Sequence, residues 1–309
     1  MADIPTIAYV FPGQGSQKVG MGKELYNKYP SVKEIFDQAD AALGFPLSQL
    51  CFQGPEEELV KTVNVQPAIL TTSIAYLKAV QKANQDNLPS ARFVAGHSLG
   101  EYTALVAANA LTLTNAVKLV RERGRLMYEA GLKNTGGMLA IIGASEEIVK
   151  SISFESKTEI SNINCPNQIV ISGASDALAE AGKLAKTKGV HVIPLKVSGA
   201  FHSALMEPIT AEFSKVLSNF TFLPPTIPII SNTTAEMLTE VDSIKKELSA
   251  QLQNCIQWQR SVEYMIYNGI NTFYEIGPGK VLSGLLKRIN PELQIWNTSE
   301  TGDTLKLTG

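Results

Sequence analysis

The fold predicted for this chain follows from one stretch, Arg92-Phe93-Val94-Ala95-Gly96-His97-Ser98-Leu99-Gly100-Glu101-Tyr102. Its apolar start, residues 93–95, is typical of a buried strand, and residues 101–110 after the glycines are compatible with a helix. Between them lies the pattern Gly-x-Ser-x-Gly, a sharp strand-to-helix turn that presents a serine hydroxyl. Ser98 is therefore the predicted nucleophile, and the alternative is a glycine-rich turn with an ordinary capping serine.

The glycines and the helix start have separate roles in this turn. A Cβ atom at Gly96 or Gly100 would press on the neighbouring strand or helix. Behind Ser98, the free backbone N–H groups of the helix start and the positive end of its dipole suit a developing oxyanion. The turn thus favours chemistry in which a serine attacks a carbonyl group.

Composition limits the classes of protein to be considered. The 309 residues, 44% of them hydrophobic, can form one large α/β domain or two smaller ones. The net charge of −2, without a lysine- or arginine-rich run, argues against nucleic acid or an anionic membrane as the main partner. Cys51, Cys165 and Cys255 are too sparse for a disulfide or zinc framework and indicate a cytoplasmic protein. We find no signal peptide and no apolar run near the roughly 20 residues that span a bilayer.

A second loop that is a candidate part of the functional site lies near the N-terminus. The apolar run Ile7–Phe11 predicts a buried strand, which is closed by Pro12-Gly13-Gln14-Gly15-Ser16-Gln17. Two glycines allow the backbone to come close to another group, and Gln14 projects between them. A dinucleotide-binding loop is excluded, because Lys18 stands where that motif needs its third glycine.

The larger of two predicted units combines short apolar runs, read as strands, with segments of helical periodicity. Its predicted strands are residues 7–11, 93–95, 229–231 and 272–276, and its predicted helices are residues 23–43 (interrupted near Pro30), 68–83 (opened by Pro67), 101–110, 114–130, 244–252, 258–268 and 281–289.

The smaller unit has the order strand, helix, strand, strand, helix, strand, which is ferredoxin-like. We therefore predict an α/β fold in which a large α/β-hydrolase-like domain with a parallel sheet core, residues 1–130 and 203–309, carries an inserted ferredoxin-like domain, residues 131–202. The inserted strands are residues 138–142, 159–162, 168–172 and 190–197, and the helices are residues 145–153, capped by Ser145, and 175–188, capped by Ser175 or Asp176.

Two further residues are candidates for the site. Arg123 follows Val120 by three positions and precedes Met127 by four, so it faces the apolar side of its helix. A buried arginine needs a partner, which is either a structural carboxylate or the carboxylate of a ligand. His202 lies in a glycine-containing loop at the predicted domain junction, where clefts form, and the alternative is a structural histidine.

Together, these separated motifs resemble the malonyl-CoA:acyl carrier protein transacylase family, the acyltransferases that load malonyl groups for fatty acid synthesis. The resemblance runs in family order from residue 11 to residue 279, and the inserted ferredoxin-like domain is also the family's second domain. The matching motifs are Phe11-Pro12-Gly13-Gln14-Gly15-Ser16-Gln17, Gln66-Pro67-Ala68, Gly96-His97-Ser98-Leu99-Gly100-Glu101-Tyr102, Arg123-Gly124 with Met127, Asn162-Ile163-Asn164, Ala200-Phe201-His202-Ser203, Gln251 ahead of Trp258, and Glu275-Ile276-Gly277-Pro278-Gly279.

The resemblance implies a catalytic role for five residues. Ser98 takes the acyl group as an ester, and His202 is the general base for the serine and the general acid for the leaving thiolate. A backbone carbonyl near Gln251 orients the histidine ring in place of an acidic side chain. The backbone N–H groups of Gln14 and Leu99 form the oxyanion hole.

The resemblance also implies five substrate-binding residues. Arg123 binds the free carboxylate of malonate, which a bidentate guanidinium is suited to recognise. Phe201 is expected to crowd an α-methyl group, as in malonyl-selective relatives. Met127, Gln66 and Asn162 complete the predicted substrate site.

The implied reaction is a ping-pong transfer in which malonyl-CoA and the holo acyl carrier protein are the two substrates. It requires no metal and no bound cofactor, and the expected state of the enzyme is a monomer. A basic rim beside the cleft would suit the acidic carrier, with Lys280, Lys287 and Arg288 as candidates.

Three other functions remain open at this point. A serine esterase or thioesterase has the same turn, but an α/β-hydrolase places its acid between the serine and a histidine near the C-terminus, whereas no acid-bearing motif lies between Ser98 and His202. An acyltransferase that acts in trans for a polyketide pathway fits the same residues. A non-catalytic carrier-binding protein is disfavoured by the presence of Ser98, His202 and Arg123.

Overall fold

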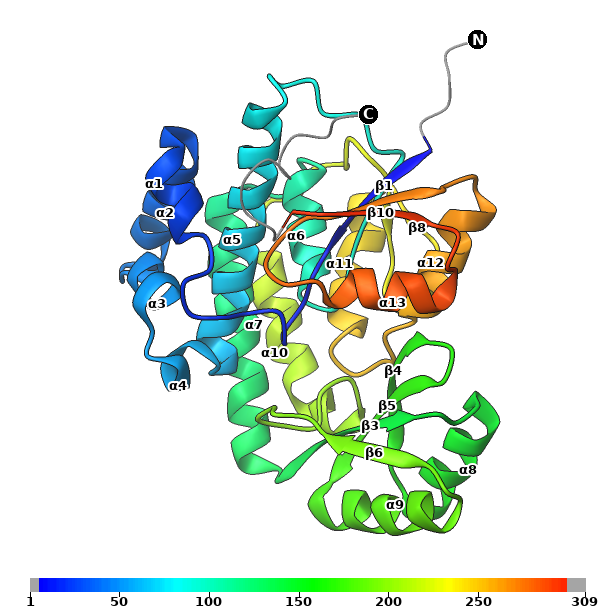
Figure 1. The fold of residues 1–309 in the computed structure, drawn as a ribbon. Coiled ribbons are helices and arrows are strands. Elements are labelled where there is room, and N and C mark those ends of the chain that lie inside the picture. Colours follow the sequence, from blue (N-terminus) through cyan, green and yellow to red (C-terminus); the bar gives the residue numbers. More distant parts are fainter. Residues whose placement is uncertain (1–5, 299–309) are drawn as a thin grey trace.

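Two β-sheets organise the chain in the computed structural model, which describes residues 6–298 (Figure 1). The first sheet has the order β10-β9-β1-β2-β7-β8, and its strands are parallel apart from the β7–β8 pair. The fold is thus mixed α/β with a parallel sheet, as predicted. The strands are β1 (Ile7–Phe11), β2 (Phe93–Gly96), β7 (Ile229–Ile230), β8 (Met237–Leu238), β9 (Thr272–Glu275) and β10 (Gln294–Asn297).

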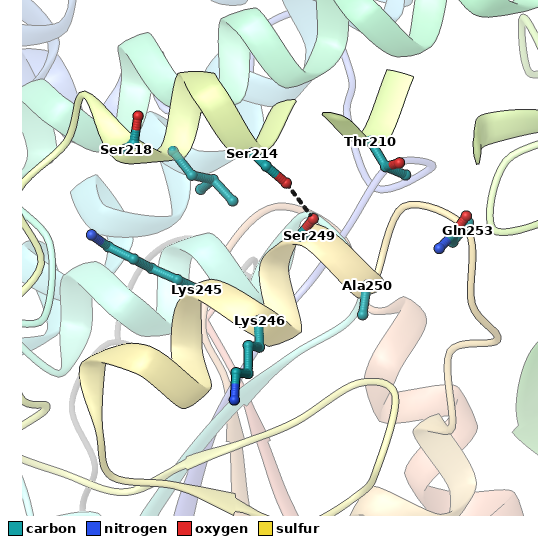
Figure 2. Close-up of a pocket in the computed structure, with 9 residues that line it drawn as sticks. Thr210, Ser214, Ser218, Lys245, Lys246, Ser249, Ala250 and Gln253 are labelled. Carbon is teal, nitrogen blue, oxygen red and sulfur yellow. Dashed lines mark hydrogen bonds between the residues drawn. The ribbon is translucent and has the colours of Figure 1, made fainter. Parts of the chain in front are cut away.

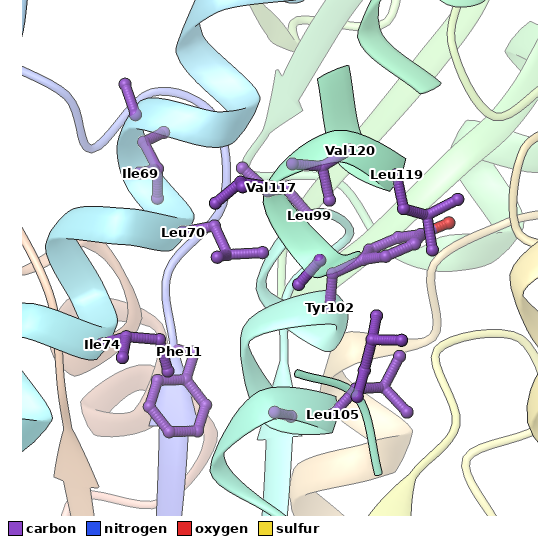
Figure 3. Packing of buried hydrophobic residues seen from close by; sticks show 14 of the residues in the cluster. Phe11, Ile69, Leu70, Ile74, Leu99, Tyr102, Leu105, Val117, Leu119 and Val120 are labelled. Carbon is purple, nitrogen blue, oxygen red and sulfur yellow. The ribbon is translucent and has the colours of Figure 1, made fainter. Parts of the chain in front are cut away.

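Helices cover both faces of this sheet. Side chains alternate along a strand, so Phe11 faces a core on one side of the sheet while Val10 faces a second core on the other. Figure 3 shows the first of these cores, where α5, α6 and α7 pack together. The helices of the large unit are α1 (Lys23–Lys28), α2 (Pro30–Leu43), α3 (Leu47–Gln53), α4 (Glu56–Leu59), α5 (Thr62–Ala83), α6 (Gly100–Ala107), α7 (Leu113–Lys133), α10 (Glu207–Ser218), α11 (Val241–Ala250), α12 (Trp258–Tyr267) and α13 (Val281–Ile289), with a 3₁₀ turn at Ala204–Met206.

The register of the parallel strands places the two predicted loops together. Phe11 at the end of β1 pairs with Gly96 at the end of β2. The carboxyl ends of parallel strands share one edge of the sheet, so the loop that begins at Pro12 and the turn around Ser98 leave from the same edge. Ligands in open α/β sheets bind at this edge.

The second sheet is antiparallel, with the order β4-β5-β3-β6, and lies below the first sheet in Figure 1. Helices α8 and α9 pack on one of its faces. From the other face, Met138, Ala140 and Val170 join the core of the large unit. Its elements follow the predicted order: β3 (Gly136–Ile142), α8 (Glu146–Ser156), β4 (Glu159–Cys165), β5 (Gln168–Ala174), α9 (Ser175–Thr187) and β6 (His191–Pro194).

The two connections to the second sheet run side by side. A Cβ atom on Gly131, near the end of α7, would collide with the backbone carbonyl of Ser198, which lies on the returning segment. Only glycine permits this approach, because any side chain would push the outgoing and returning segments apart.

Several details differ from the predictions. Helix α5 begins at Thr62 and contains Pro67 in its interior, where burial of most of the helix offsets the lost hydrogen bond and the crowding by the proline ring. The predicted cap of α9 is wrong: Ala174 is the N-cap, and Ser175 is already the first helical residue. Strand β6 is shorter than predicted, and α3, α10, β8 and β10 were not predicted. Within residues 6–298, no helix combines the length and apolar character needed to cross a membrane.

Candidate active site

The turn at Ser98 is held by close backbone contacts. Ser98 has a φ of 50°, in the left-handed region that residues other than glycine rarely adopt. A Cβ atom on Gly96 would collide with the backbone of Gly100, and one on Gly100 with the Phe11 carbonyl. Asn232 closes the turn, because it accepts from the Ser98 N–H at 2.7 Å and donates to the Gly96 carbonyl at 2.7 Å. The serine is therefore fixed at the carboxyl edge of the sheet.

A histidine 104 residues further along the chain contacts this serine. The Ser98 Oγ lies 2.9 Å from His202 Nε2, and His202 Nδ1 lies 2.7 Å from the backbone carbonyl of Gln251. A carbonyl only accepts, so Nδ1 carries the imidazole proton and Nε2 is free to accept from the serine. The His202 backbone, with a φ of 57°, donates to the Leu252 carbonyl at 3.1 Å. The segment after α11 thus holds both the ring and the backbone of His202.

His202 is neutral in this environment. Burial lowers its pKa from 6.5 to about 3, with the positive charge of Arg123 as the next cause. A neutral imidazole is the form that can take a proton from Ser98.

The acylation of Ser98 that the resemblance implies is therefore expected to keep its rate as the pH falls through 6.5, with an acid limb only as the pH approaches the His202 pKa of about 3. The measurement is the initial rate of CoA release from malonyl-CoA as a function of pH. Stability should change in the same interval: between about pH 3 and 6.5 the unfolded chain binds a proton at this residue and the native state does not, so the free energy of unfolding rises with pH. A rate that halves near pH 6.5 would contradict the assignment of a buried, neutral base.

Two backbone N–H groups beside Ser98 lack an acceptor within the described residues. Gln14 and Leu99 both line the cavity at Ser98, and within residues 6–298 neither N–H finds an acceptor. Gly13 brings the first loop close, since a Cβ atom there would collide with the His97 carbonyl. The Ser98 N–H is already donated to Asn232, which leaves these two donors for a ligand.

Arg123 lies behind the serine with neutral partners only. Its side chain is 1% exposed, and it donates to Gln66 Oε1 at 2.9 Å, Gln251 Oε1 at 2.8 Å and Ser98 Oγ at 3.1 Å. In the described part of the chain, no carboxylate oxygen lies within 4.0 Å of the Arg123 guanidinium. A buried guanidinium without a carboxylate retains a full positive charge for an anionic ligand.

The neighbouring arginines of α7 differ from Arg123. Arg125 forms ion pairs at the surface with Glu122, Glu129 and Glu212. Arg121 is half-buried over the Phe45 ring. Only the middle arginine of the three therefore reaches the site.

A cavity of about 380 Å³ opens between the Ser98 turn and the second sheet. Gln66 and Gln251 lie outside its lining, fully buried behind Arg123 and His202, and Gln66 Nε2 also donates to Met127 Sδ at 3.4 Å. The predicted site residues that line the cavity are Gln14, Ser98, Leu99, Arg123, Met127, Asn162, Phe201 and His202.

Three contacting residues were not assigned a role from the sequence. Asn232 follows β7, and a polar residue after a predicted strand was the one available signal. Asn164 Oδ1 lies 2.8 Å from His97 Nε2 at the cavity wall. Glu101 belongs to the quoted motif, but its partners come from distant parts of the chain.

Two residues of the predicted basic rim, Lys287 and Arg288, contact other parts of the chain. Lys287 donates to the carbonyls of Pro291 and Leu293, and Arg288 donates to Gln168 Oε1. The described residues contain no group of three or more His, Cys, Asp or Glu side chains that could hold a metal ion. The docking role of the rim stays a prediction.

A second hollow, of about 490 Å³, lies between α10 and α11 (Figure 2). Its walls carry Lys245, Lys246 and a pair of serines, Ser214 and Ser249, whose hydroxyls are 2.8 Å apart. None of the predicted site residues lines it. This second hollow is thus separate from the serine–histidine pair.

The fold and the serine–histidine pair together define a class, the α/β enzymes equipped to hold an acyl group on a serine. Similarity to known proteins narrows this class. The family model of the acyl transferase domain matches residues 8–292. The chain belongs to this family and, within it, to the malonyl CoA-acyl carrier protein transacylases.

Three relatives illustrate the similarity. The malonyl CoA-acyl carrier protein transacylase of Bacillus subtilis is 45% identical over 307 residues, 97% of this chain and 95% of that protein. The crystal structure of an acyl carrier protein S-malonyltransferase from Vibrio cholerae has a TM-score of 0.91 at 41% identity, covering 95% of this chain and 96% of the other. A malonyl-transacylase in complex with its type II PKS acyl-carrier protein has a TM-score of 0.92 at 38% identity, covering 97% and 98%.

Proposed function

We propose that this chain transfers the malonyl group from malonyl-CoA to the phosphopantetheine thiol of acyl carrier protein, through a malonyl ester on Ser98. The observation that carries the proposal is the position of Arg123, 3.1 Å from Ser98 Oγ in a buried site without a carboxylate partner. In a malonyl ester, the free carboxylate carbon is three bonds from that oxygen. A guanidinium this close to the serine therefore suits a short diacid.

In the first half-reaction, the Ser98 hydroxyl gives its proton to His202 Nε2 while Oγ attacks the thioester carbonyl. The N–H groups of Gln14 and Leu99 stabilise the resulting oxyanion. The intermediate then collapses, the C–S bond breaks, and the CoA thiolate takes the proton back from His202. In the second half-reaction, the carrier thiol gives its proton to the same nitrogen, the thiolate attacks the ester, and Ser98 leaves with the proton.

The predicted selectivity against branched acyl groups has a physical basis in the cavity wall. Phe201, which is 4% exposed, lines the cavity together with Met127 and Asn162. An α-methyl group would have to displace part of this wall, which costs about 1–3 kcal/mol. The expected result is a preference for malonyl over methylmalonyl units.

The finer description of the fold belongs to the same proposal. We assign residues 131–202 as an inserted ferredoxin-like domain, which the strand order β4-β5-β3-β6 supports, and residues 1–130 with 203–309 as a large α/β-hydrolase-like domain. A monomeric enzyme in the cytoplasm, acting without a cofactor in fatty acid synthesis, completes the assignment. The polyketide alternative keeps one observation in its favour, the similarity to the transacylase solved with a type II PKS acyl-carrier protein.

Transfer is distinguished from hydrolysis by the fate of the acylated enzyme. The enzyme is first mixed with malonyl-CoA and freed of excess thioester. Intact-mass spectrometry then follows the adduct after addition of holo or apo acyl carrier protein. We expect the holo carrier to remove the adduct and gain the malonyl group, while the apo carrier, which lacks the thiol, leaves the adduct in place. Loss at the same rate with either carrier would identify a hydrolase instead.

A further inference from the structure

A buried carboxylate, Glu101, lies next to the candidate site without contacting the cavity. It is the second residue of α6, three positions after Ser98, and is 1% exposed. Its Oε1 accepts from the backbone N–H of Asn232 at 3.0 Å, and its Oε2 accepts from Gln251 Nε2. Both contacts are donors, so the carboxylate form satisfies both.

These contacts determine which way the Gln251 amide points. Gln251 Nε2 donates one proton to the Ser98 carbonyl at 3.1 Å and the other to Glu101. With both amide protons used on this side, Gln251 Oε1 must face the opposite side, where it accepts from Arg123 Nη2 at 2.8 Å. The Gln251 amide thus connects the carboxylate of Glu101 on one side with the guanidinium of Arg123 on the other.

The same arrangement keeps the negative charge of Glu101 out of direct contact with Arg123, because the Gln251 amide lies between them. A carboxylate in direct contact would compete with an anionic substrate for the guanidinium, whereas an amide oxygen does not. The coupling is mutual: burial and then Glu247 raise the pKa of Glu101 well above its ordinary value, while its two donors and Arg123 act in the opposite direction. The two donors and the positive charge of Arg123 therefore oppose the effect of burial and favour the carboxylate form of Glu101.

We propose that Glu101 is a positioning residue for malonyl selectivity, which orients the Gln251 amide so that Arg123 is held with its charge available to the substrate carboxylate. The inference rests on the proposed role of Arg123. It assigns to Gln251 a second task beside the backbone carbonyl that holds His202.

The test is Glu101→Gln. The backbone N–H of Asn232 cannot turn, so the new side chain presents its oxygen there and its NH₂ group to Gln251. Gln251 must then turn its amide over, and its NH₂ group meets the donors of Arg123. We expect the ratio of kcat/KM for malonyl-CoA to that for acetyl-CoA to fall roughly 10- to 100-fold, the loss of one charge-assisted hydrogen bond. The rate of acylation by each thioester is measured as the release of CoA.

Glu247→Gln is the matched control. Glu247 is also a buried carboxylate, 5% exposed, but within residues 6–298 its side chain accepts only from Ser231 and Thr233. It should lower the thermal melting temperature in a similar way. Because removal of its like charge favours the carboxylate form of Glu101, the ratio of the two thioesters should not fall. If Glu101→Gln does not melt cooperatively, Gln251→Met takes its place, because it removes the amide and keeps the backbone carbonyl at His202.

Arg123→Ala separates failure of this inference from failure of the proposed function. If Arg123→Ala abolishes the malonyl preference and Glu101→Gln retains it, the positioning role is wrong and the carboxylate site stands. If Arg123→Ala itself retains the preference for malonyl-CoA, both the positioning role of Glu101 and the carboxylate-binding role of Arg123 are wrong. The double variant should show the ratio of Arg123→Ala alone, because the two residues act through one path; a further fall in the ratio would contradict that path.

Discussion

Ser98→Ala is expected to yield no covalent malonyl enzyme and to slow transfer to the carrier by roughly 10⁴- to 10⁶-fold, as for other serine nucleophiles. The reason is chemical, since the variant lacks the one hydroxyl within residues 6–298 that contacts His202 Nε2, at 2.9 Å. Intact-mass spectrometry after mixing with malonyl-CoA measures the adduct, and the appearance of malonyl carrier measures the transfer.

The control for this variant is another serine at the rim of a cavity. Ser214 lines the hollow between α10 and α11, and its hydroxyl lies 2.8 Å from the hydroxyl of Ser249. Ser214→Ala should form the adduct at the rate of the unmodified enzyme. An adduct that survives in Ser98→Ala, in a protein that still melts cooperatively, would refute the assignment of the nucleophile.

Arg123→Ala is expected to lower kcat/KM for malonyl-CoA by roughly 10²- to 10⁴-fold and to leave that for acetyl-CoA little changed. Two charge-assisted hydrogen bonds from a guanidinium to a carboxylate contribute about 3–6 kcal/mol together, which corresponds to this range. Acetyl-CoA has no second carboxylate and loses nothing from their removal. Competition between the two thioesters in one reaction gives the ratio directly.

Arg125→Ala on the same helix is the matched control. It removes the same charge from α7, but its partners Glu122, Glu129 and Glu212 are at the surface. Exposed ion pairs contribute about 0–1 kcal/mol, so the ratio of the two thioesters should not move. A malonyl preference that is equal in both arginine variants would exclude Arg123 as the carboxylate site.

The fold was predictable where local sequence and tertiary structure agree. Residues 7–11 and 93–96 are apolar on both faces, as a strand buried between helices requires, and the helix break at Pro30 follows from proline chemistry. Pro67 misled the prediction, because helix α5 is buried along most of its length and tolerates one missing hydrogen bond. Strand β10, four residues at the edge of the sheet, is too short for an unambiguous periodicity.

The site was predictable to the extent that each residue has a local signal. The turn at Ser98 has a motif, and the apolar spacing around Arg123 indicated that it points inward. Contacts made through backbone atoms and amide orientations have no such signal. The two acceptors of Glu101 are satisfied by Asn232 and Gln251, which are more than 100 residues away and on different loops. Only the packed structure brings them together.

Because the connections at Gly131 and Ser198 lie side by side, we expect that the second sheet can be exchanged as one segment. The two ends of the inserted segment leave and re-enter the large unit side by side. The large unit therefore accommodates the segment as it would a long loop whose ends are close together. This segment supplies Asn162, Asn164 and Val170 to the cavity wall, whereas Ser98, Arg123 and the backbone N–H groups of Gln14 and Leu99 belong to the large unit. Exchange of this segment between related chains is therefore a route to new acyl selectivity at constant chemistry, with both splice points at residues that already touch.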